Sequence, residues 1–265
     1  MKRNLRTALA SFIISCFIVS TSSAQMNGSN VYWHIDPGVK SCSMVIDPSL
    51  TQAQWQTFIK QAGAILTFKS LASAQPLGKA NFYIALENDN SPIDQHSLAW
   101  INTFTHPDAD CPLGDAVSFP AIRARIGLSE DMDLGAYWTM APKANYGMVG
   151  GEVKYRLSQE TEMLPTAAVR ASVMVLTGVS DFDFSEYSVD LIASKKISVV
   201  TPYAGFRASR AIGTETTPKV NLDKESLFIA QGFAGVSCSV WVFNLAAEYN
   251  VSHINTFALA VGVGF

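Results

Sequence analysis

The sequence predicts an all-β protein: a transmembrane, antiparallel, up-and-down β-barrel of about ten strands that follows an N-terminal amphipathic helix. The last residues, Thr256–Phe265, alternate between large apolar side chains and small or polar ones. Many segments after residue 80 show the same period of two, which is typical of strands. An export signal precedes them, and no run of about 18 apolar residues follows it, so a membrane-spanning structure has to be built from strands.

The first 24 residues have the features of a secretory signal peptide. Three basic residues are followed by an apolar run from Ala8 to Val19 and by a small-residue site ending at Ala24, where we expect cleavage. A membrane anchor is the alternative, but the apolar run is shorter than the roughly 20 residues that a span needs. Cys16 also lies in a sequence similar to a lipoprotein box, although apolar residues continue beyond it to Val19.

Composition argues against a soluble or nucleic-acid-binding protein. Hydrophobic residues make up 48% of the chain and charged residues 15%, which is low for a soluble domain. Without the signal peptide's three basic residues, 16 basic residues (19 − 3) face 22 acidic ones, a net charge of −6. Nucleic-acid-binding proteins usually carry clustered basic charge, so nucleic acid is not an expected partner.

Residues 25–79 are expected to form an N-terminal periplasmic segment with one helix. Trp55, Phe58, Ile59 and Ala62 recur at the three- and four-residue spacing of an amphipathic helix over residues 52–66. Ser49 or Thr51 is the candidate N-cap. Because the polar face is rich in Gln and carries one Lys, the helix is expected to pack on its own domain or close one end of the barrel, and not to lie on a membrane.

Residues 80–265 are predicted to form the barrel. Many of the alternating segments are near ten residues long, the length that a tilted membrane strand requires. One segment, 225–236, is ambiguous because Phe228 and Phe233 fall on opposite faces. Alternation alone would also fit a soluble β-sandwich. The candidate strands are 80–88, 118–128, 132–141, 146–157, 165–178, 185–195, 198–211, 225–236, 239–250 and 254–265.

The connections between these segments predict an orientation. If Phe265 ends on the periplasmic side, the connections at 129–131, 158–164, 196–197 and 237–238 are periplasmic and mostly short. The remaining connections, which include the longest, are then extracellular, as in bacterial barrels. The N-terminus is expected on the periplasmic side as well.

Full charges lie on the polar faces of the predicted strands and are expected to point into the lumen. A charge in a narrow lumen is costly unless it is paired, so Arg170 is expected to bridge Glu152 and Asp190 on the two neighbouring strands. Either a salt-bridge network that plugs the lumen or a narrow charge-selective pore would fit this pattern. The predicted network comprises Arg123, Arg125, Glu152, Lys154, Arg156, Arg170, Asp190, Arg207 and Glu248.

The region from Ala80 to Phe265 resembles a small, single-chain outer-membrane β-barrel of Gram-negative bacteria. The resemblance depends on the alternation that ends in Phe265 and on the segments 202–206 and 150–155. It implies an outer-membrane location, outer-membrane lipids as neighbours, and Phe265 as a signal for the barrel-assembly machinery. Such barrels serve as pores, anchors, adhesins and, in a few cases, enzymes.

Three cysteines follow the signal peptide, and an exported protein with three is expected to form one disulfide. Cys42 and Cys111 are the candidates for it, with Cys42 and Cys238 as the alternative pair. The cysteines and histidines lack the spacing of a metal site, and no cofactor is expected.

No catalytic constellation stands out. The segment Gly235–Ser239 lacks the final glycine of a hydrolase nucleophile motif. Asp181, Asp183 and Glu186 would be candidates in a membrane-embedded barrel enzyme, but no base or nucleophile accompanies them. The expected function is therefore non-enzymatic: a structural or adhesive barrel, or a narrow pore whose lumen is largely plugged. A barrel enzyme acting on lipid or peptide and a soluble periplasmic carrier are the alternatives.

Overall fold

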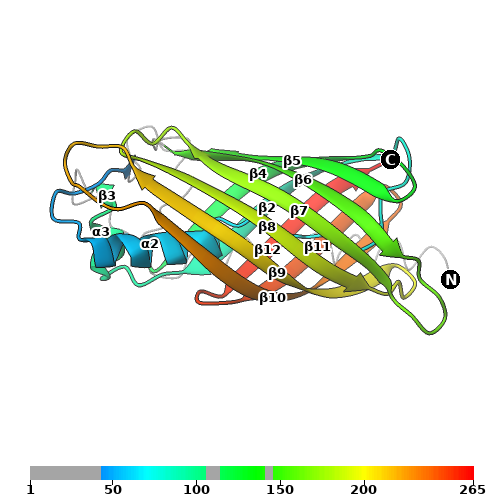
Figure 1. The fold of residues 1–265 in the computed structure, drawn as a ribbon. Helices are drawn as coiled ribbons and strands as arrows, with labels where there is room; N and C mark the ends of the chain where they lie inside the picture. Colours follow the sequence, from blue (N-terminus) through cyan, green and yellow to red (C-terminus); the bar gives the residue numbers. More distant parts are fainter. Residues whose placement is uncertain (1–42, 106–113, 141–145) are drawn as a thin grey trace.

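A computed structural model describes residues 43–105, 114–140 and 146–265. Within these residues, ten antiparallel strands close into a barrel in which each strand pairs with its neighbours in the chain and β12 pairs with β2 (Figure 1). The predicted closed up-and-down barrel is therefore confirmed. The signal peptide, Cys42 and Cys111 lie outside the described residues. The strands of the barrel are β2 (Phe82–Pro92), β4 (Ala116–Gly127), β5 (Met132–Met140), β6 (Gly147–Ser158), β7 (Thr166–Thr177), β8 (Phe182–Ser194), β9 (Val200–Glu215), β10 (Glu225–Val240), β11 (Phe243–Val251) and β12 (Thr256–Gly264).

The two ends of the barrel differ. One end, the C-terminal rim, holds Phe265, the start of β2 and the turns β4–β5, β6–β7, β8–β9 and β10–β11. The opposite end, the helix rim, holds α2 (Gln52–Ile65) and the long β2–β4 connection. That connection contains α3 (Leu98–Ile101) and β3 (Phe104–Thr105), and β3 pairs with β1 (Ser43–Met44). The connections are thus grouped at the two ends as the sequence predicted.

The barrel wall follows the alternation that the sequence shows. In β12, Phe257, Leu259 and Val261 point outward, while the small or polar residues between them point into the lumen. Across the described strands, outward-facing charge is confined to Asp183 and Arg210, near the helix rim. The outer surface is therefore a broad apolar band.

Aromatic residues at the C-terminal rim close the seam between the first and last strands. The backbones of Phe82 and Phe265 exchange two hydrogen bonds of 2.9 Å. Their rings lie 5.0 Å apart on the outer surface, and Trp241 is 89% exposed at the same rim. Exposed aromatic side chains at a barrel end are typical of a membrane–water boundary.

The strand β10 extends further than the sequence indicated. The small polar residues around Ser237 and Cys238 were predicted to form a turn, but they pair with Ala246 and Leu245 of β11. The turn lies at Trp241, which adopts a positive φ of 59°. The turn prediction was wrong because neither a glycine nor a proline marks the true position. The sequence left open which face of this strand points into the barrel. In the structure, Phe228 faces outward and Phe233 faces the lumen.

The helix α2 forms where the sequence predicted it, with Thr51 as its N-cap. The Thr51 side chain accepts a hydrogen bond from the Gln54 amide, and the Gln54 side-chain oxygen accepts one from the Thr51 amide. Trp55 and Phe58 contact Phe182 of the wall at centroid distances of 5.4 and 5.7 Å. None of the helices in the described residues is long and apolar enough to cross a membrane.

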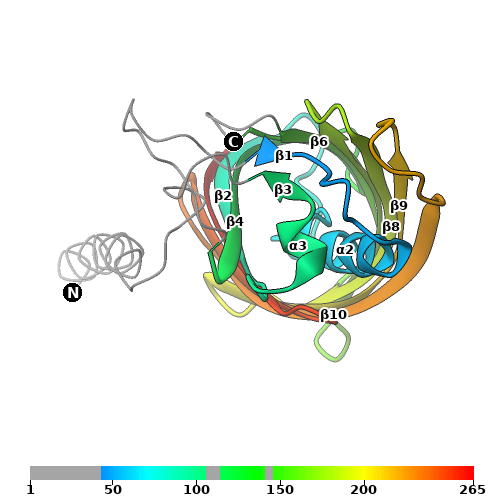
Figure 2. The same cartoon turned by 90° about the vertical axis from the view of Figure 1, so that its left-hand side faces the viewer.

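The position of α2 differs from the expectation that it would lie at the same end as Phe265. It lies within the ring of strands at the helix rim, against the inner faces of β9 and β10 (Figure 2). Gly213 of β9 permits this close approach, because a Cβ there would lie 2.2 Å from Ile59. The amphipathic pattern identifies the buried face of the helix but not the end of the barrel that receives it.

Asp181 attaches the start of the described chain to the wall at the helix rim. Its carboxylate accepts hydrogen bonds from the Ile46 amide at 2.9 Å and from Lys219 Nζ at 2.7 Å. Burial raises the pKa of Asp181, but these hydrogen bonds outweigh burial, so the net pKa lies below its usual value. The carboxylate therefore stabilises the fold above the ordinary aspartate pKa of about 4, and this stabilisation is lost as the pH falls through the folded-state pKa.

Replacing Asp181 by Asn should lower stability at pH 7 by about 1.5–3 kcal/mol, the usual contribution of hydrogen bonds to a charged group. The difference from wild type should shrink as the pH falls below about 4, because the wild-type carboxyl is then protonated too. Thermal unfolding in neutral detergent at several pH values measures both effects. Asp183→Asn, which changes an outward-facing neighbour, is the control. A deficit that stays constant down to pH 3 would contradict this role of the carboxylate.

Candidate functional site: the filled lumen

The lumen is occupied by the chain itself. After α2, residues 66–79, here called the luminal segment, run through the barrel from the helix rim to the C-terminal rim, where β2 begins. This segment has no regular secondary structure. Its peptide groups cannot be left unbonded inside a barrel, since each buried, unpaired polar group costs free energy. The wall therefore has to supply their partners.

Two arginines of the wall hold the carbonyl groups at the start of the luminal segment. Arg123 donates to the carbonyls of Lys69 and Ser70 at 2.6 and 2.9 Å. Arg170 donates to those of Phe68 and Lys69 at 2.5 and 2.9 Å. Both guanidinium groups also lie over the Phe68 ring, at 4.3 and 5.4 Å from its centroid. Three consecutive carbonyls and one aromatic ring are thus fixed by two side chains, one from β4 and one from β7.

Other wall residues bond the amides and carbonyls that follow. Glu248 of β11 accepts hydrogen bonds from the Ser70 and Leu71 amides at 3.3 and 2.8 Å. Further along, Ser194 accepts from the Ala74 amide and Asp133 from the Leu77 amide. Lys154 donates to the carbonyls of Ser73 and Gln75 at 3.2 and 2.8 Å. The segment is therefore attached along its length to the side chains of several strands.

The wall charges are also paired with one another. Arg170 forms ion pairs with Glu152 at 2.8 Å and with Asp190 at 2.6 Å, which are the two pairs expected for it. Asp190 faces Arg170 on one side and Arg207 on the other, and Arg207 Nε lies 2.9 Å from it. Arg123 bonds Glu87 at 2.9 Å. These side chains are almost fully buried, so both partners of each pair are needed to offset desolvation.

Lys69 contributes a cation from the luminal segment itself. Its ammonium group donates to the carbonyls of Ala64 and Ile65 at 3.2 and 2.9 Å and thereby caps the C-terminus of α2. Gln231 of β10 donates to the same Ala64 carbonyl. The helix and the luminal segment are in this way joined to each other and to the wall.

The charges in the lumen nearly balance. Apart from the buried Asp181 at the helix rim, the buried residues of the described chain include six cations (Lys69, Arg123, Arg125, Lys154, Arg170, Arg207) and seven carboxylates (Glu87, Asp89, Asp133, Glu152, Glu186, Asp190, Glu248). A balanced set of this kind gives no large field of one sign through the lumen. The arrangement suits a closed barrel better than a pore that selects ions by charge.

The structure brings together most of the residues that the alternation assigned to the lumen. Arg123, Arg125, Glu152, Lys154, Arg170, Asp190, Arg207 and Glu248 are buried inside the barrel. Arg156 lies apart from them, at the C-terminal rim, where it pairs with the half-exposed Asp131 at 2.5 Å.

Sequence reasoning missed several lumen residues. Glu87 lies within the predicted strand 80–88 on the face opposite the outward-facing Leu86, and Asp89 lies one residue beyond that strand, so the period of two would have found both had it been applied there and the strand been extended. Asp133 and Glu186 follow the same rule in β5 and β8. Lys69 carries no such signal, because it lies outside any strand.

The acidic residues considered for a barrel enzyme do not converge. Asp181 is engaged by Ile46 and Lys219, Asp183 points outward and Glu186 points into the lumen. Cys238, the third cysteine, lies in β10 and forms no disulfide with any of the described residues.

One family model matches this chain. It is described as a family of unknown function, DUF6588, and it matches residues 76–265. The chain belongs to the DUF6588 family. The match in this DUF6588 protein begins within the luminal segment and includes every strand of the barrel wall, while α2 precedes it. No curated protein sequence matches the chain.

Several solved structures are similar to this DUF6588 protein at low identity. The crystal structure of Ail, the attachment invasion locus protein of Yersinia pestis, has 15% identity and a TM-score of 0.31 and covers 71% of this chain and 99% of that one. The COG4313 outer membrane channel from Pseudomonas putida F1 has 8% identity and a TM-score of 0.45, with 75% and 100% coverage. The translocator domain of autotransporter NalP from Neisseria meningitidis has 10% identity and a TM-score of 0.41, with 80% and 95% coverage. Because the identities and TM-scores are this low, the functions that these names state apply to those proteins and are not assigned to this chain.

Two arginines offer a direct test of the lumen network. Arg170→Ala would leave the Phe68 carbonyl without a donor and would remove one partner each from Glu152, Asp190 and the Lys69 carbonyl, so we expect a loss of about 3–5 kcal/mol. Arg156→Ala is the matched control, because its pair at the rim is partly solvated and should contribute no more than about 1 kcal/mol. Urea unfolding in neutral detergent, followed by tryptophan fluorescence, measures both. Equal losses in the two variants would mean that the buried network is not what stabilises the barrel.

Proposed function

We propose that this protein is a non-enzymatic outer-membrane barrel that its own N-terminal chain keeps closed, with a structural role in the envelope and no role as an open porin. The observation that carries the proposal is the luminal segment, whose peptide groups are bonded by Arg123, Arg170, Glu248 and Lys154 of the wall. A permeation path would have to break these bonds, most of which are buried and charge-assisted.

The outer surface supports a membrane location. Large apolar side chains cover the wall, and the two charged residues that face outward from the described strands lie near one end. A surface of this kind is stable against hydrocarbon, and a closed barrel leaves no strand edge without hydrogen bonds. We propose outer-membrane lipids as its neighbours.

The C-terminal rim is proposed to face the periplasm. Phe265 ends the chain with its ring exposed on the outer surface, in a position accessible to barrel-assembly machinery. The helix rim, with α2, α3 and the longest connection, then faces the cell exterior, as long loops do in bacterial barrels. The protein would thus present a short, rigid helical surface outside the cell.

In planar bilayers, the wild-type protein should show no steady conductance, because the luminal segment fills the barrel. Combining Arg123→Ala with Arg170→Ala removes the donors to three successive carbonyls, so the segment should loosen and brief openings should appear. Single-channel recording measures both behaviours, with Arg156→Ala as a control that should stay closed. Steady wild-type conductance with the segment intact would overturn the closed-barrel proposal.

The location is tested separately by membrane fractionation. The protein should be recovered with the outer membrane, should require detergent for solubility, and should migrate faster on a gel before boiling than after it. Recovery as a soluble protein in buffer alone would contradict the membrane location and would favour a periplasmic carrier.

A further inference from the structure

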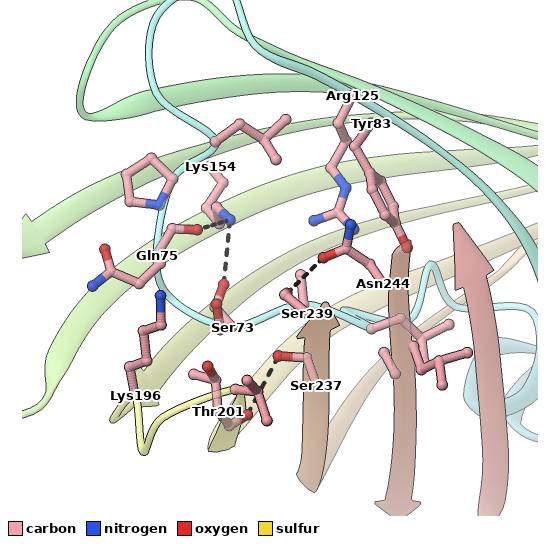
Figure 3. A pocket seen from close by; sticks show the side chains of 17 residues that line it. Ser73, Gln75, Tyr83, Arg125, Lys154, Lys196, Thr201, Ser237, Ser239 and Asn244 are labelled. Carbon is pink, nitrogen blue, oxygen red and sulfur yellow. Dashed lines mark hydrogen bonds between the residues drawn. The ribbon is translucent and has the colours of Figure 1, made fainter. Parts of the chain in front are cut away.

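A cavity of about 250 Å³ lies at the C-terminal rim, between the luminal segment and the wall. It lies beside residues 71–77 and is bounded by strands from both sides of the barrel, including β2, β9, β10 and β11 (Figure 3). It is open to the surroundings at the rim, near the β8–β9 turn that carries Lys196. The function proposed above makes no use of this space.

The lining of this cavity has a strong charge bias. Arg125, Lys154 and Lys196 approach it from different elements, and none of the described residues that line it is acidic. The bias is local, because the whole chain has a formal net charge of −3. An enclosed space lined by charge of one sign attracts ligands of the opposite sign.

The three cations differ in how far their donors are already used. Lys154 is fully engaged, by two carbonyls of the luminal segment and by Asp133 at 3.0 Å. Arg125 is buried, and its Nε makes no hydrogen bond. Nε of Arg125 lies 3.7 Å from the nearer carboxylate oxygen of Glu152, and the guanidinium carbon lies 4.6 Å from the centroid of the Tyr83 ring. Nε therefore faces Glu152, and the donors that Arg125 can offer a ligand are its two terminal nitrogens, which bond no carboxylate or carbonyl of the described residues and are held in place over the Tyr83 ring.

Lys196 is exposed at the mouth, and its ammonium group has no hydrogen-bond or ion-pair partner among the described residues. Between the two cations lie hydroxyl and amide groups, among them Ser73 and Asn244, beside an apolar wall formed by Leu71, Leu77 and Ala246. The polar groups suit an oxyanion, and the apolar wall suits a short hydrocarbon body attached to it.

We propose that this cavity binds a small organic phosphate, with the phosphate group held between Arg125 and Lys196 and the organic body against Leu71 and Ala246. Arg125 is the buried anchor, because a guanidinium can donate two parallel hydrogen bonds to a phosphate. Lys196 attracts the anion at the mouth. Lys154 holds the adjacent stretch of the luminal segment in the conformation that forms the site. In the orientation proposed above, the ligand enters from the periplasm or from the inner leaflet.

Calorimetric titration of the full-length protein in a non-ionic detergent at low salt tests the proposal with four probes. These are inorganic phosphate, glycerol 3-phosphate, a short-chain phosphatidate, and glycerol as the uncharged control. Binding of glycerol 3-phosphate would indicate a soluble ligand, and binding of phosphatidate alone would indicate a lipid headgroup. Both results support the site. Binding of none of the phosphates, or equal binding of glycerol, overturns it.

Substitutions in and beside the cavity test whether the phosphate binds at the proposed residues. Arg125→Gln should weaken binding about tenfold or more, as expected for the loss of a charged hydrogen bond. Lys196→Gln should weaken it about three- to fivefold, because this lysine is solvated. Lys195→Gln is the matched control: it lies on the same turn, but its ammonium donates to the Glu162 carbonyl and does not line the cavity. Its affinity should match that of wild type.

A variant of the exposed Lys196 keeps the test available if the variant of the buried Arg125 misfolds. If Arg125→Gln fails to give a heat-modifiable barrel, the charge reversal Lys196→Glu still tests the site, because a turn residue tolerates substitution. That variant should lose most of the binding and keep the gel mobility of wild type. Unchanged affinity in Lys196→Glu overturns the proposed site. A failure of this proposal leaves the conductance prediction unaffected, since binding and closure are measured independently.

Discussion

The structure depends on one constraint: the peptide groups of the luminal segment must find hydrogen-bond partners where neither water nor a neighbouring strand supplies them. In the wall, each strand satisfies its backbone through two neighbours, and the luminal segment has none. Arg123, Arg170, Glu248 and Lys154 therefore act as its partners. Their charges explain why the inner face of a membrane-type barrel carries so many buried ionic groups.

The same constraint divides the interior into three layers. Near the helix rim, α2 satisfies its own backbone and needs only an apolar surface, which residues such as Phe182 and Phe184 provide. In the middle, the chain leaves the helix at Ile65, and the wall changes from apolar to charged at that level. Towards the C-terminal rim the segment no longer fills the barrel, and the cavity beside Arg125 remains. The type of inward-facing residue thus follows the conformation of the chain that it contacts.

The sequence predicted the wall well, because alternation is a local property that a strand imposes on its own residues. It predicted α2 and its Thr51 cap for the same reason. It could not place α2 inside the barrel, because the apolar face of a helix does not reveal which surface covers it. Lys69 was missed because its role depends on the path of an irregular segment, and Arg156 was misplaced because alternation gives the facing of a residue but not its depth. The turn at Trp241 lacked the glycine or proline that usually marks one.

Buried ion pairs in soluble proteins can often be replaced by apolar residues of similar volume with little loss. The pairs of Arg123 and Arg170 differ, because each of these two arginines divides its donors between a carboxylate and main-chain carbonyls. An apolar side chain of the same volume would fill the space of Arg170 but would leave the carbonyl of Phe68 unbonded and the carbonyl of Lys69 with Arg123 as its remaining donor. The ion pairs therefore hold their side chains in position, and the hydrogen bonds to the luminal segment are what an apolar core could not supply. The buried charges that bond the luminal segment are therefore also what keeps the barrel closed.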